Sequence, residues 1–227
     1  MLLAIDTSTT AVGAALHDGA RVVARVVRED GRRHGELLGP AVRQVLQDAG
    51  AGRRDLTRIV VGVGPGPFTG LRVGVVTGLV MAHALALPAP DGVCSLDVLA
   101  HELVGRQEGP VLVATDARRK EVYWAVYELG GAGARRVQGP GVARAVDLPE
   151  QVRHLPTVGR GPSLYPDALP HPLPQAPLDV DPGVLADLAH RLAAGDHPDA
   201  DLALLPPEPL SLRRPDAVAG AVRGGGR

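Results

Sequence analysis

Runs of apolar residues, interrupted by short polar or glycine-rich segments, organise the first half of the chain. Two short apolar runs and a third run that alternates apolar and polar positions predict three strands. Apolar residues at a spacing of 3.6 then predict a helix, which Gly50 ends. Another apolar run and a long apolar helix follow. The predicted order is strand, strand, strand, helix, strand and helix, at residues 1–5, 11–16, 21–27, 34–49, 59–63 and 70–87.

The second half repeats part of this layout. A short apolar run ends in Asp116 and another strand follows, just as the first strand is followed by Asp6 and then by a second strand. We therefore expect an α/β architecture of two similarly built lobes, with mixed sheets flanked by helices. The expected lobes are residues 1–105, which carry the two long helices, and residues 106–216, with a disordered tail at 217–227. The other expected elements are a helix at 95–104 with Ser95 as its N-cap, strands at 111–115, 121–129 and near 157–159, a helix near 147–152, and a helix at 182–194 with Asp181 as its N-cap.

A loop rich in glycine and proline joins the strand at 59–63 to the long helix. A strand, a glycine loop and a helix N-terminus form many anion sites, because the first-turn N–H groups face the loop. The segment Gly64-Pro65-Gly66-Pro67-Phe68-Thr69 lacks the lysine of a P-loop, and its two prolines have no N–H to donate. Two interpretations stay open: a phosphate cradle, or a tight turn in which Thr69 is the helix N-cap.

Polar residues also follow the first strand. The hydroxyl and N–H groups of Asp6-Thr7-Ser8-Thr9 could hold a phosphate, and Asp6 could approach a metal; the alternative is a turn that satisfies its own backbone. Asp116 could be the second carboxylate of a nucleotide site. The candidate anion or nucleotide site comprises Asp6, Thr7, Ser8, Gly64, Gly66, Thr69, Gly70 and Asp116.

Small residues recur every four positions along the helix at 70–87 and form a ridge on one face, at Gly70, Gly74, Gly78, Ala82 and Ala86. Such a ridge lets another backbone approach closely and favours a helix crossing of roughly −50°. The rest of this helix is apolar all round, which predicts burial on more than one side. The ridge is expected to pack either inside the chain or against another subunit.

Composition narrows the function classes. The formal net charge of −1 gives no global reason to expect nucleic-acid binding, and 45% apolar residues support a sizeable core. A lone cysteine, Cys94, and the lack of a signal peptide are typical of a cytoplasmic protein. Arg72 and His83 interrupt the long apolar helix, so we expect it not to span a membrane.

The sequence patterns of catalytic sites are missing. None of the eight histidines lies three to five residues from another, so the zinc patterns are absent. The serines and Cys94 lie outside any nucleophile-elbow motif. We therefore predict no metal site and no catalytic residue, which favours a binding role.

Six short motifs occur in order along nearly the whole chain. The most specific is Gly64-Pro65-Gly66-Pro67-Phe68-Thr69-Gly70-Leu71-Arg72. The others are Asp6-Thr7-Ser8-Thr9, Arg33-His34-Gly35-Glu36, Asp116-Ala117-Arg118, Glu121-Val122-Tyr123 and Leu212-Arg213-Arg214-Pro215. Together they resemble the TsaB (YeaZ) family of tRNA threonylcarbamoyladenosine biosynthesis.

The resemblance implies a two-lobed actin/sugar-kinase/Hsp70-type (RNase H-like) fold without catalytic activity. It implies a scaffold subunit that pairs with and activates the catalytic paralogue TsaD, together with the ATPase TsaE. The complex forms N6-threonylcarbamoyladenosine at position 37 of tRNAs that read codons beginning with A. The resemblance leaves open whether this subunit contacts tRNA. It implies no tightly bound cofactor, since Pro67 stands where the family often has serine; ATP or ADP is expected only at an interface shared within the complex.

In the family, helices of the N-terminal lobe form the interface with TsaD, or with a second TsaB when the subunit is alone. These helices correspond to residues 34–49 and 70–87 of this chain. The expected contact residues are His34, Leu38, Val42, Gly70, Val73, Gly74, Gly78 and Ala82. The alternative of another class is an active ATP-dependent kinase or a glycoprotease-like hydrolase of the same fold, with a carboxylate-based site.

Overall fold

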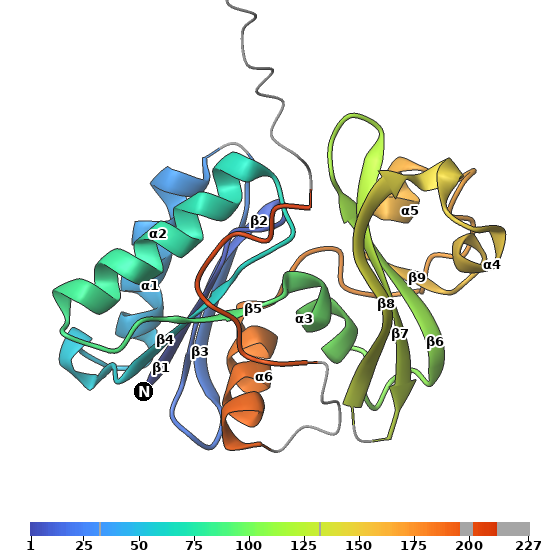
Figure 1. Cartoon of the computed structure of the whole chain (residues 1–227). Coiled ribbons are helices and arrows are strands. Elements are labelled where there is room, and N and C mark those ends of the chain that lie inside the picture. Colours follow the sequence, from blue (N-terminus) through green and yellow to red (C-terminus); the bar gives the residue numbers. More distant parts are fainter. Residues whose placement is uncertain (32, 132, 196–201, 213–227) are drawn as a thin grey trace, which may run out of the picture.

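The computed structural model describes residues 1–31, 33–131, 133–195 and 202–212. It contains two mixed β-sheets that lie side by side, with helices packed against them (Figure 1). Within the described residues, none of the helices has the length and hydropathy that would cross a bilayer. The predicted α/β class with mixed sheets is confirmed.

The first sheet has the strand order β3-β2-β1-β4-β5. Strand β1 pairs antiparallel with β2 and parallel with β4, so that Ile5 lies opposite both Ala14 and Val61. Every residue of β1 and β2 is buried, because helices cover both faces of the sheet. The strands are β1 (Leu2–Asp6), β2 (Ala11–His17), β3 (Val22–Glu29), β4 (Arg58–Gly62) and β5 (Asp91–Val93).

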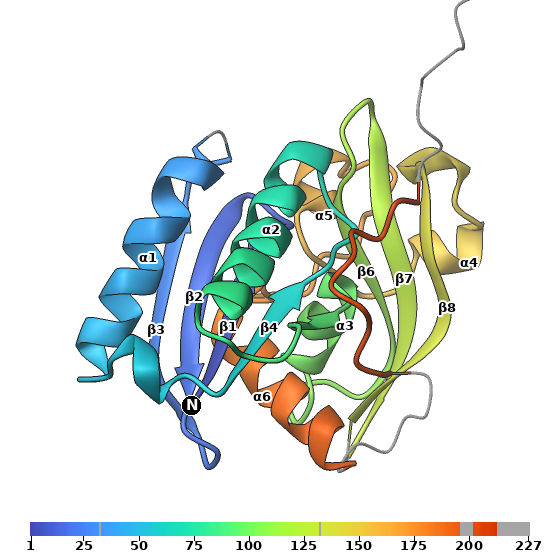
Figure 2. The same ribbon diagram turned by 60° about the vertical axis from the view of Figure 1, so that its left-hand side comes forward.

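The two faces of the first sheet are covered by helices from different parts of the chain. Helices α1 (His34–Asp48) and α2 (Phe68–Ala84) cover one face, and α6 (Pro182–Ala194) covers the other (Figures 1 and 2). Side chains alternate accordingly along β1: Leu3 and Ile5 join the core under α1 and α2, whereas Leu2 and Ala4 join the core under α6.

The second sheet has the order β8-β7-β6-β9 and the same pattern of directions as β3-β2-β1-β4. The repeated layout that the sequence predicted is therefore confirmed. The strands are β6 (Gly109–Asp116), β7 (Glu121–Gly130), β8 (Gly133–Arg144) and β9 (Thr157–Val158). Short helices complete this part of the chain: η2 (Ala145–Asp147), α4 (Glu150–Arg153) and α5 (Gly161–Leu164); η1 (Arg53–Asp55) precedes β4.

A short helix between the sheets gives them a common core. Helix α3 (Ser95–His101) is buried along its whole length, and its apolar residues share one cluster with Val60 of the first sheet and Val113 of the second. The hydroxyl of Tyr127 donates a 2.6 Å hydrogen bond to Asp97, which fixes α3 to the second sheet.

The end of the described chain returns to the first sheet. Helix α6 contacts β1, β2 and β3, and the N–H of Gly92 in β5 donates to the carbonyl of Leu205 at 2.7 Å. Helix α6 and residues 202–210, which the predicted lobe of residues 106–216 includes, therefore pack with the first sheet. The predicted disordered tail, residues 217–227, lies outside the described residues.

Most predicted elements are present with shifted ends. Helix α6 has the predicted bounds, and the Asp181 side chain caps it by accepting from the N–H of Gly183 at 2.7 Å. Two caps were wrong: Cys94 and Pro67 are the N-cap residues of α3 and α2, so Ser95 and Thr69 lie inside the first turns. The helix predicted at 95–104 ends at His101, and the one near 147–152 is divided into η2 and α4. Strands β5 and β8 and helix α5 were not predicted.

Candidate functional site

A cleft of about 320 Å³ opens between the two sheets, at the ends of β1 and β6. The turn between β1 and β2 forms one wall, the N-termini of α1 and α2 form another, and the end of β6 lies opposite. Its lining residues are Thr7, Ser8, Thr9, Thr10, Gly31, His34, Gly35, Pro67, Phe68, Thr69, Gly70, Val73, Thr115, Asp116, Arg118, Arg160, Leu178 and Asp179.

Five of the eight predicted anion-site residues line this cleft, namely Thr7, Ser8, Thr69, Gly70 and Asp116. The other three, Asp6, Gly64 and Gly66, are buried behind it. The structure thus brings most of the candidates together, because strand ends and helix starts of repeated units meet at one edge. The sequence pattern did not distinguish lining residues from the residues that support them.

Asp6 is buried behind the cleft, where it holds the turn after β1 through hydrogen bonds. Its carboxylate is 1% exposed; Oδ1 accepts from the N–H and the hydroxyl of Ser8 at 2.8 Å, and Oδ2 accepts from the Ser95 hydroxyl at 2.9 Å. Burial raises the pKa of Asp6 to about 6, and the hydrogen bonds from Ser8 and Ser95 offset part of that effect. Gly62 makes room for it, since a Cβ there would lie 1.7 Å from Oδ2. Its oxygens are thus engaged inside the protein.

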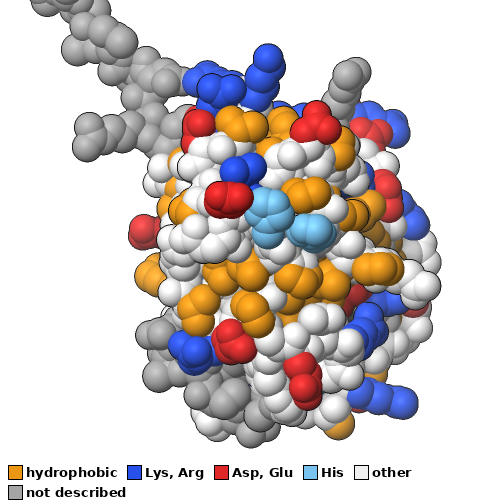
Figure 3. All heavy atoms as spheres, turned by 90° about the vertical axis from the view of Figure 1, so that its right-hand side faces the viewer, with side chains coloured by type: hydrophobic (Ala, Val, Ile, Leu, Met, Phe, Trp, Pro, Cys, Tyr) orange, Lys and Arg blue, Asp and Glu red, His pale blue; other side chains and the backbone are white. Residues whose placement is uncertain are grey.

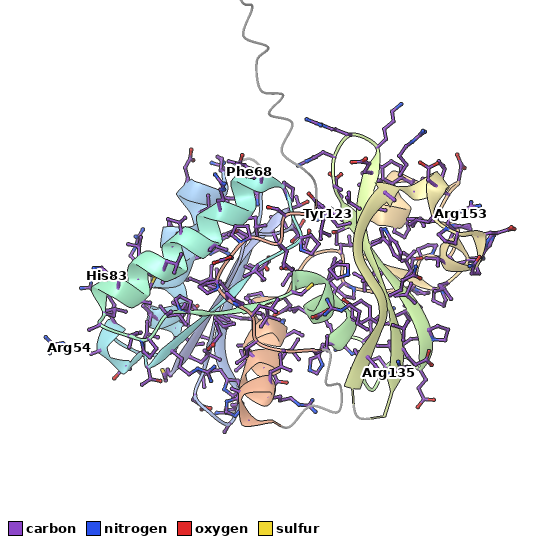
Figure 4. The ribbon with its side chains drawn as sticks, viewed as in Figure 1. Arg54, Phe68, His83, Tyr123, Arg135 and Arg153 are labelled. Carbon is purple, nitrogen blue, oxygen red and sulfur yellow. The ribbon has the colours of Figure 1, made fainter. Side chains whose placement is uncertain are left out.

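The glycine loop before α2 packs on the polar turn after β1. The N–H of Gly64 donates to the Ser95 hydroxyl at 3.1 Å, and its φ of 84° lies in the left-handed region that favours glycine. A Cβ on Gly66 would lie 2.3 Å from the carbonyl oxygen of Ser8. Tyr123 reaches across from the second sheet, and its hydroxyl donates to the Gly66 carbonyl at 3.3 Å (Figure 4). These contacts favour the interpretation of the loop as a tight turn.

Charged residues that the candidate list lacked lie on the far side of the cleft. Arg160 forms a two-pronged ion pair with Asp179 and approaches Glu29 at 3.5 Å, while Asp179 also accepts from the N–H of Thr10 at 3.1 Å. This network joins the second sheet to the turn after β1. No local signal marked it, because its members come from four separate segments.

Arg118 follows the predicted Asp116 by two residues. Its N–H donates to Asp116 Oδ1 at 2.7 Å, and its guanidinium lies 3.1 Å from Oδ2. Asp116 is therefore paired with a cation at the rim of the cleft. Within the described residues, no group of three or more histidine, cysteine or carboxylate side chains is placed to hold a metal ion.

The small-residue ridge of α2 faces the sheet. A Cβ on Gly74 would lie 2.5 Å from Thr7 Oγ1, and one on Gly78 would lie 2.5 Å from Val61 Cγ1. Gly70 and Ala82 are also buried, whereas Ala86 lies beyond the helix and is exposed. The ridge therefore packs inside the chain. A contact with a partner through these small side chains is excluded, because the sheet already occupies that face.

The opposite face of α2 is exposed and largely apolar, although Arg72 and His83 also lie on it, and this exposure contradicts the predicted burial on more than one side. Phe68 and Val80 are each 61% exposed, and Val76 and Leu79 are exposed as well. Figure 4 shows Phe68 and His83 at the two ends of the helix. Of the other predicted contact residues, Leu38 and Val42 belong to the core, His34 donates from Nε2 to the Thr9 carbonyl at 3.0 Å, and Val73 is partly exposed.

Comparison with known proteins identifies the family. Residues 22–165 match the family model described as TsaD: tRNA N6-adenosine threonylcarbamoyltransferase. An uncharacterized protein of Mycobacterium tuberculosis is 40% identical over 225 residues, which are 97% of this chain and 95% of that protein. The Escherichia coli tRNA threonylcarbamoyladenosine biosynthesis protein TsaB is 34% identical over 174 residues, which are 73% of this chain and 74% of that protein.

Two solved structures resemble this chain both in fold and in sequence. A Pseudomonas aeruginosa protein described as similar to peptidase YEAZ superposes with a TM-score of 0.74 and 31% identity, over 93% of this chain and 99% of its own. The structure titled YeaZ from the same organism superposes with a TM-score of 0.69 and 30% identity, over 92% of this chain and 98% of its own. They agree with the predicted α/β fold class of mixed sheets flanked by helices. The chain therefore belongs to the TsaB (YeaZ) family.

Proposed function

We propose that this chain is a non-catalytic subunit in the biosynthesis of N6-threonylcarbamoyladenosine in tRNA. In this proposal it pairs with and activates a catalytic paralogue of the TsaD type, and an ATPase of the TsaE type completes the complex. The modified nucleoside is at position 37 of tRNAs that read codons beginning with A. Family membership supports the pathway, and the exposed apolar face of α2 is the observation that carries the subunit role.

The exposed face of α2 has the character of an interface. Monomeric proteins rarely expose contiguous apolar patches larger than a few hundred Å², and patches of that kind often mark contacts with other proteins. The four exposed side chains Phe68, Val76, Leu79 and Val80 lie on this 17-residue helix, and α1 packs beside it. The partner subunit, or a second copy when the chain is alone, covers this face.

The interior of the cleft supports a role without catalysis. Asp6 is buried and its oxygens accept hydrogen bonds from Ser8 and Ser95, while Asp116 is paired with Arg118. Neither carboxylate is left unpaired for a metal or a proton transfer. We expect the isolated chain to hold no nucleotide tightly, and ATP or ADP to bind at an interface shared with the partner.

The test compares two exposed valines in a reconstituted system. Val80→Asp places a charge on the proposed interface, whereas Val146→Asp places the same charge on η2, where Val146 is 54% exposed. We expect Val80→Asp to weaken association with the TsaD-type subunit at least tenfold and to reduce modified nucleoside in proportion. Val146→Asp should behave as the wild type. Unchanged association of the Val80→Asp variant would place the interface elsewhere.

A second measurement addresses the enzymatic alternative. The isolated chain should show no ATP turnover above a blank. Turnover that disappears in an Asp6→Asn variant would contradict the non-catalytic role and support a kinase of the same fold, and peptide hydrolysis by the isolated chain would support the hydrolase alternative.

A further inference from the structure

Two histidines lie together on the outer surface of the second lobe, away from the cleft. Figure 3 shows a pair of adjacent histidine side chains on this face, with apolar side chains around them and an acidic and a basic side chain beside them. The rings of His154 and His171 form a pair, with centroids 5.6 Å apart and planes inclined by 51°. They share a shallow depression with Pro156, Pro170, Pro172 and Leu173.

The hydrogen bonding of His154 fixes which nitrogen is available. Its Nδ1 lies 2.9 Å from the carbonyl oxygen of Glu150. A carbonyl can only accept, so Nδ1 carries the proton and the neutral ring has its lone pair on Nε2. Histidines that bind metals almost always donate their other ring N–H to a carbonyl or carboxylate in this way.

The backbones that carry both rings are anchored. His154 follows α4, and its N–H donates to the Glu150 carbonyl at 3.2 Å. The carbonyl of His171 accepts from the N–H of Thr157 in β9 at 2.8 Å, and the N–H of Leu173 donates to the Thr157 carbonyl at 2.9 Å. The end of α4 thus holds the backbone of His154, and β9 holds the backbone of His171.

We propose that His154 and His171 form a binding site for a divalent transition-metal ion that prefers imidazole, such as Zn²⁺, Ni²⁺ or Cu²⁺. A metal–nitrogen bond of about 2.0–2.1 Å allows a single ion to bridge rings at this separation. The residues that line the depression include no carboxylate, which selects against Mg²⁺ and Ca²⁺. Two protein ligands leave the remaining coordination positions to water or to a side chain of another molecule.

The test is zinc titration of the untagged full chain by calorimetry. We expect one Zn²⁺ per chain with micromolar affinity, and at least a tenfold loss of affinity in both His154→Gln and His171→Gln. His83→Gln, which removes an exposed histidine of α2, is the matched control and should bind as the wild type does. Binding should weaken at pH 5.5, because protons compete with the metal for the imidazoles.

Two results would overturn the proposal. One is zinc binding that survives both substitutions, because the ion would then lie at other residues. The other is the lack of binding by the wild-type chain throughout the micromolar range. Folding of each variant is checked by its circular dichroism spectrum, so that a lost ligand is distinguished from a lost fold.

Discussion

The hydroxyl of Thr7 accepts a hydrogen bond from the N–H of Gly74 at 3.0 Å and donates one to the carbonyl of Gly70 at 2.8 Å. In a regular α-helix the N–H of residue 74 donates to the carbonyl of residue 70. One side chain from the turn after β1 therefore bridges two backbone groups that belong to the same turn of α2. This bridge connects the cleft wall to the helix that carries the proposed interface.

The approach of Thr7 requires glycine at position 74. We predict that Gly74→Ala lowers the free energy of unfolding by about 1–3 kcal/mol, because the new Cβ would lie 2.5 Å from Thr7 Oγ1. The matched control is Gly35→Ala in α1, where no atom lies within 4 Å of the added Cβ and the next residue is not proline. That change should leave the free energy of unfolding unchanged or raise it by up to about 1 kcal/mol. Urea denaturation measures both; equal effects would show that the contact does not constrain the helix.

Removing the hydroxyl of Thr7 should also have a measurable effect on the free energy of unfolding. Thr7→Val keeps the shape of the side chain but leaves the Gly70 carbonyl and the Gly74 N–H without this partner. We expect a loss of about 1–2 kcal/mol in the free energy of unfolding. Thr7→Ser retains the hydroxyl and should lose less. If Thr7→Val were as stable as the wild type, the two backbone groups would be satisfied by each other alone.

The buried carboxyl of Asp6 should make stability depend on pH. Because its pKa rises from 3.8 to about 6 on folding, the native state holds a proton that the unfolded chain releases between these values. Stability from this group is present below pH 3.8 and is lost as the pH rises through about 6. The shift corresponds to about 3 kcal/mol.

The variant Asp6→Asn isolates this contribution, since the other titrating groups cancel in the comparison with the wild type. Between pH 4 and pH 7 the variant should gain about 2 kcal/mol relative to the wild type in the free energy of unfolding, since part of the total falls below pH 4. Denaturation curves at several pH values measure the difference. A difference that stays constant across this range would show that Asp6 titrates normally.

The ion pair of Arg160 with Asp179 in the cleft should contribute more to the free energy of unfolding than an exposed pair does. Asp179 is only 10% exposed as a side chain, so Arg160→Ala would leave a largely buried carboxylate without its cation. We expect a loss of about 2 kcal/mol. The exposed pair of Arg33 with Asp30 is the control, and Arg33→Ala should have no measurable effect. Similar melting temperatures for the two variants would contradict this prediction.

The elements that were predicted correctly depend on local patterns. Apolar runs that end in Asp6 and Asp116 predicted the repeated sheets, and Asp181 predicted the start of α6. Strand β8 was not predicted because it lies at the edge of the second sheet, where much of it is exposed and its apolar pattern is weak. The spacing of glycines showed that one face of α2 packs closely against a neighbour. It could not identify that neighbour as the sheet, because periodicity defines a face and not what lies against it.

The same limit applies to the site. Thr7, Ser8 and Asp116 could be found because each lies at the end of a strand. Arg160 and Asp179 meet only after the chain has folded, and no local pattern brings them together. The return of the chain to the first sheet was missed for the same reason.

The return of α6 and residues 202–210 to the first sheet affects how the chain can fold while it is being synthesised. The ribosome releases all strands of the first sheet before those of the second, yet the face under α6 stays uncovered until residue 194 has been added. The partner of Gly92, at Leu205, emerges later still. The first sheet is thus synthesised first but completed last. During translation its uncovered apolar face can aggregate or be bound by chaperones. A premature stop before residue 181 would remove that cover, although every strand of both sheets would be present.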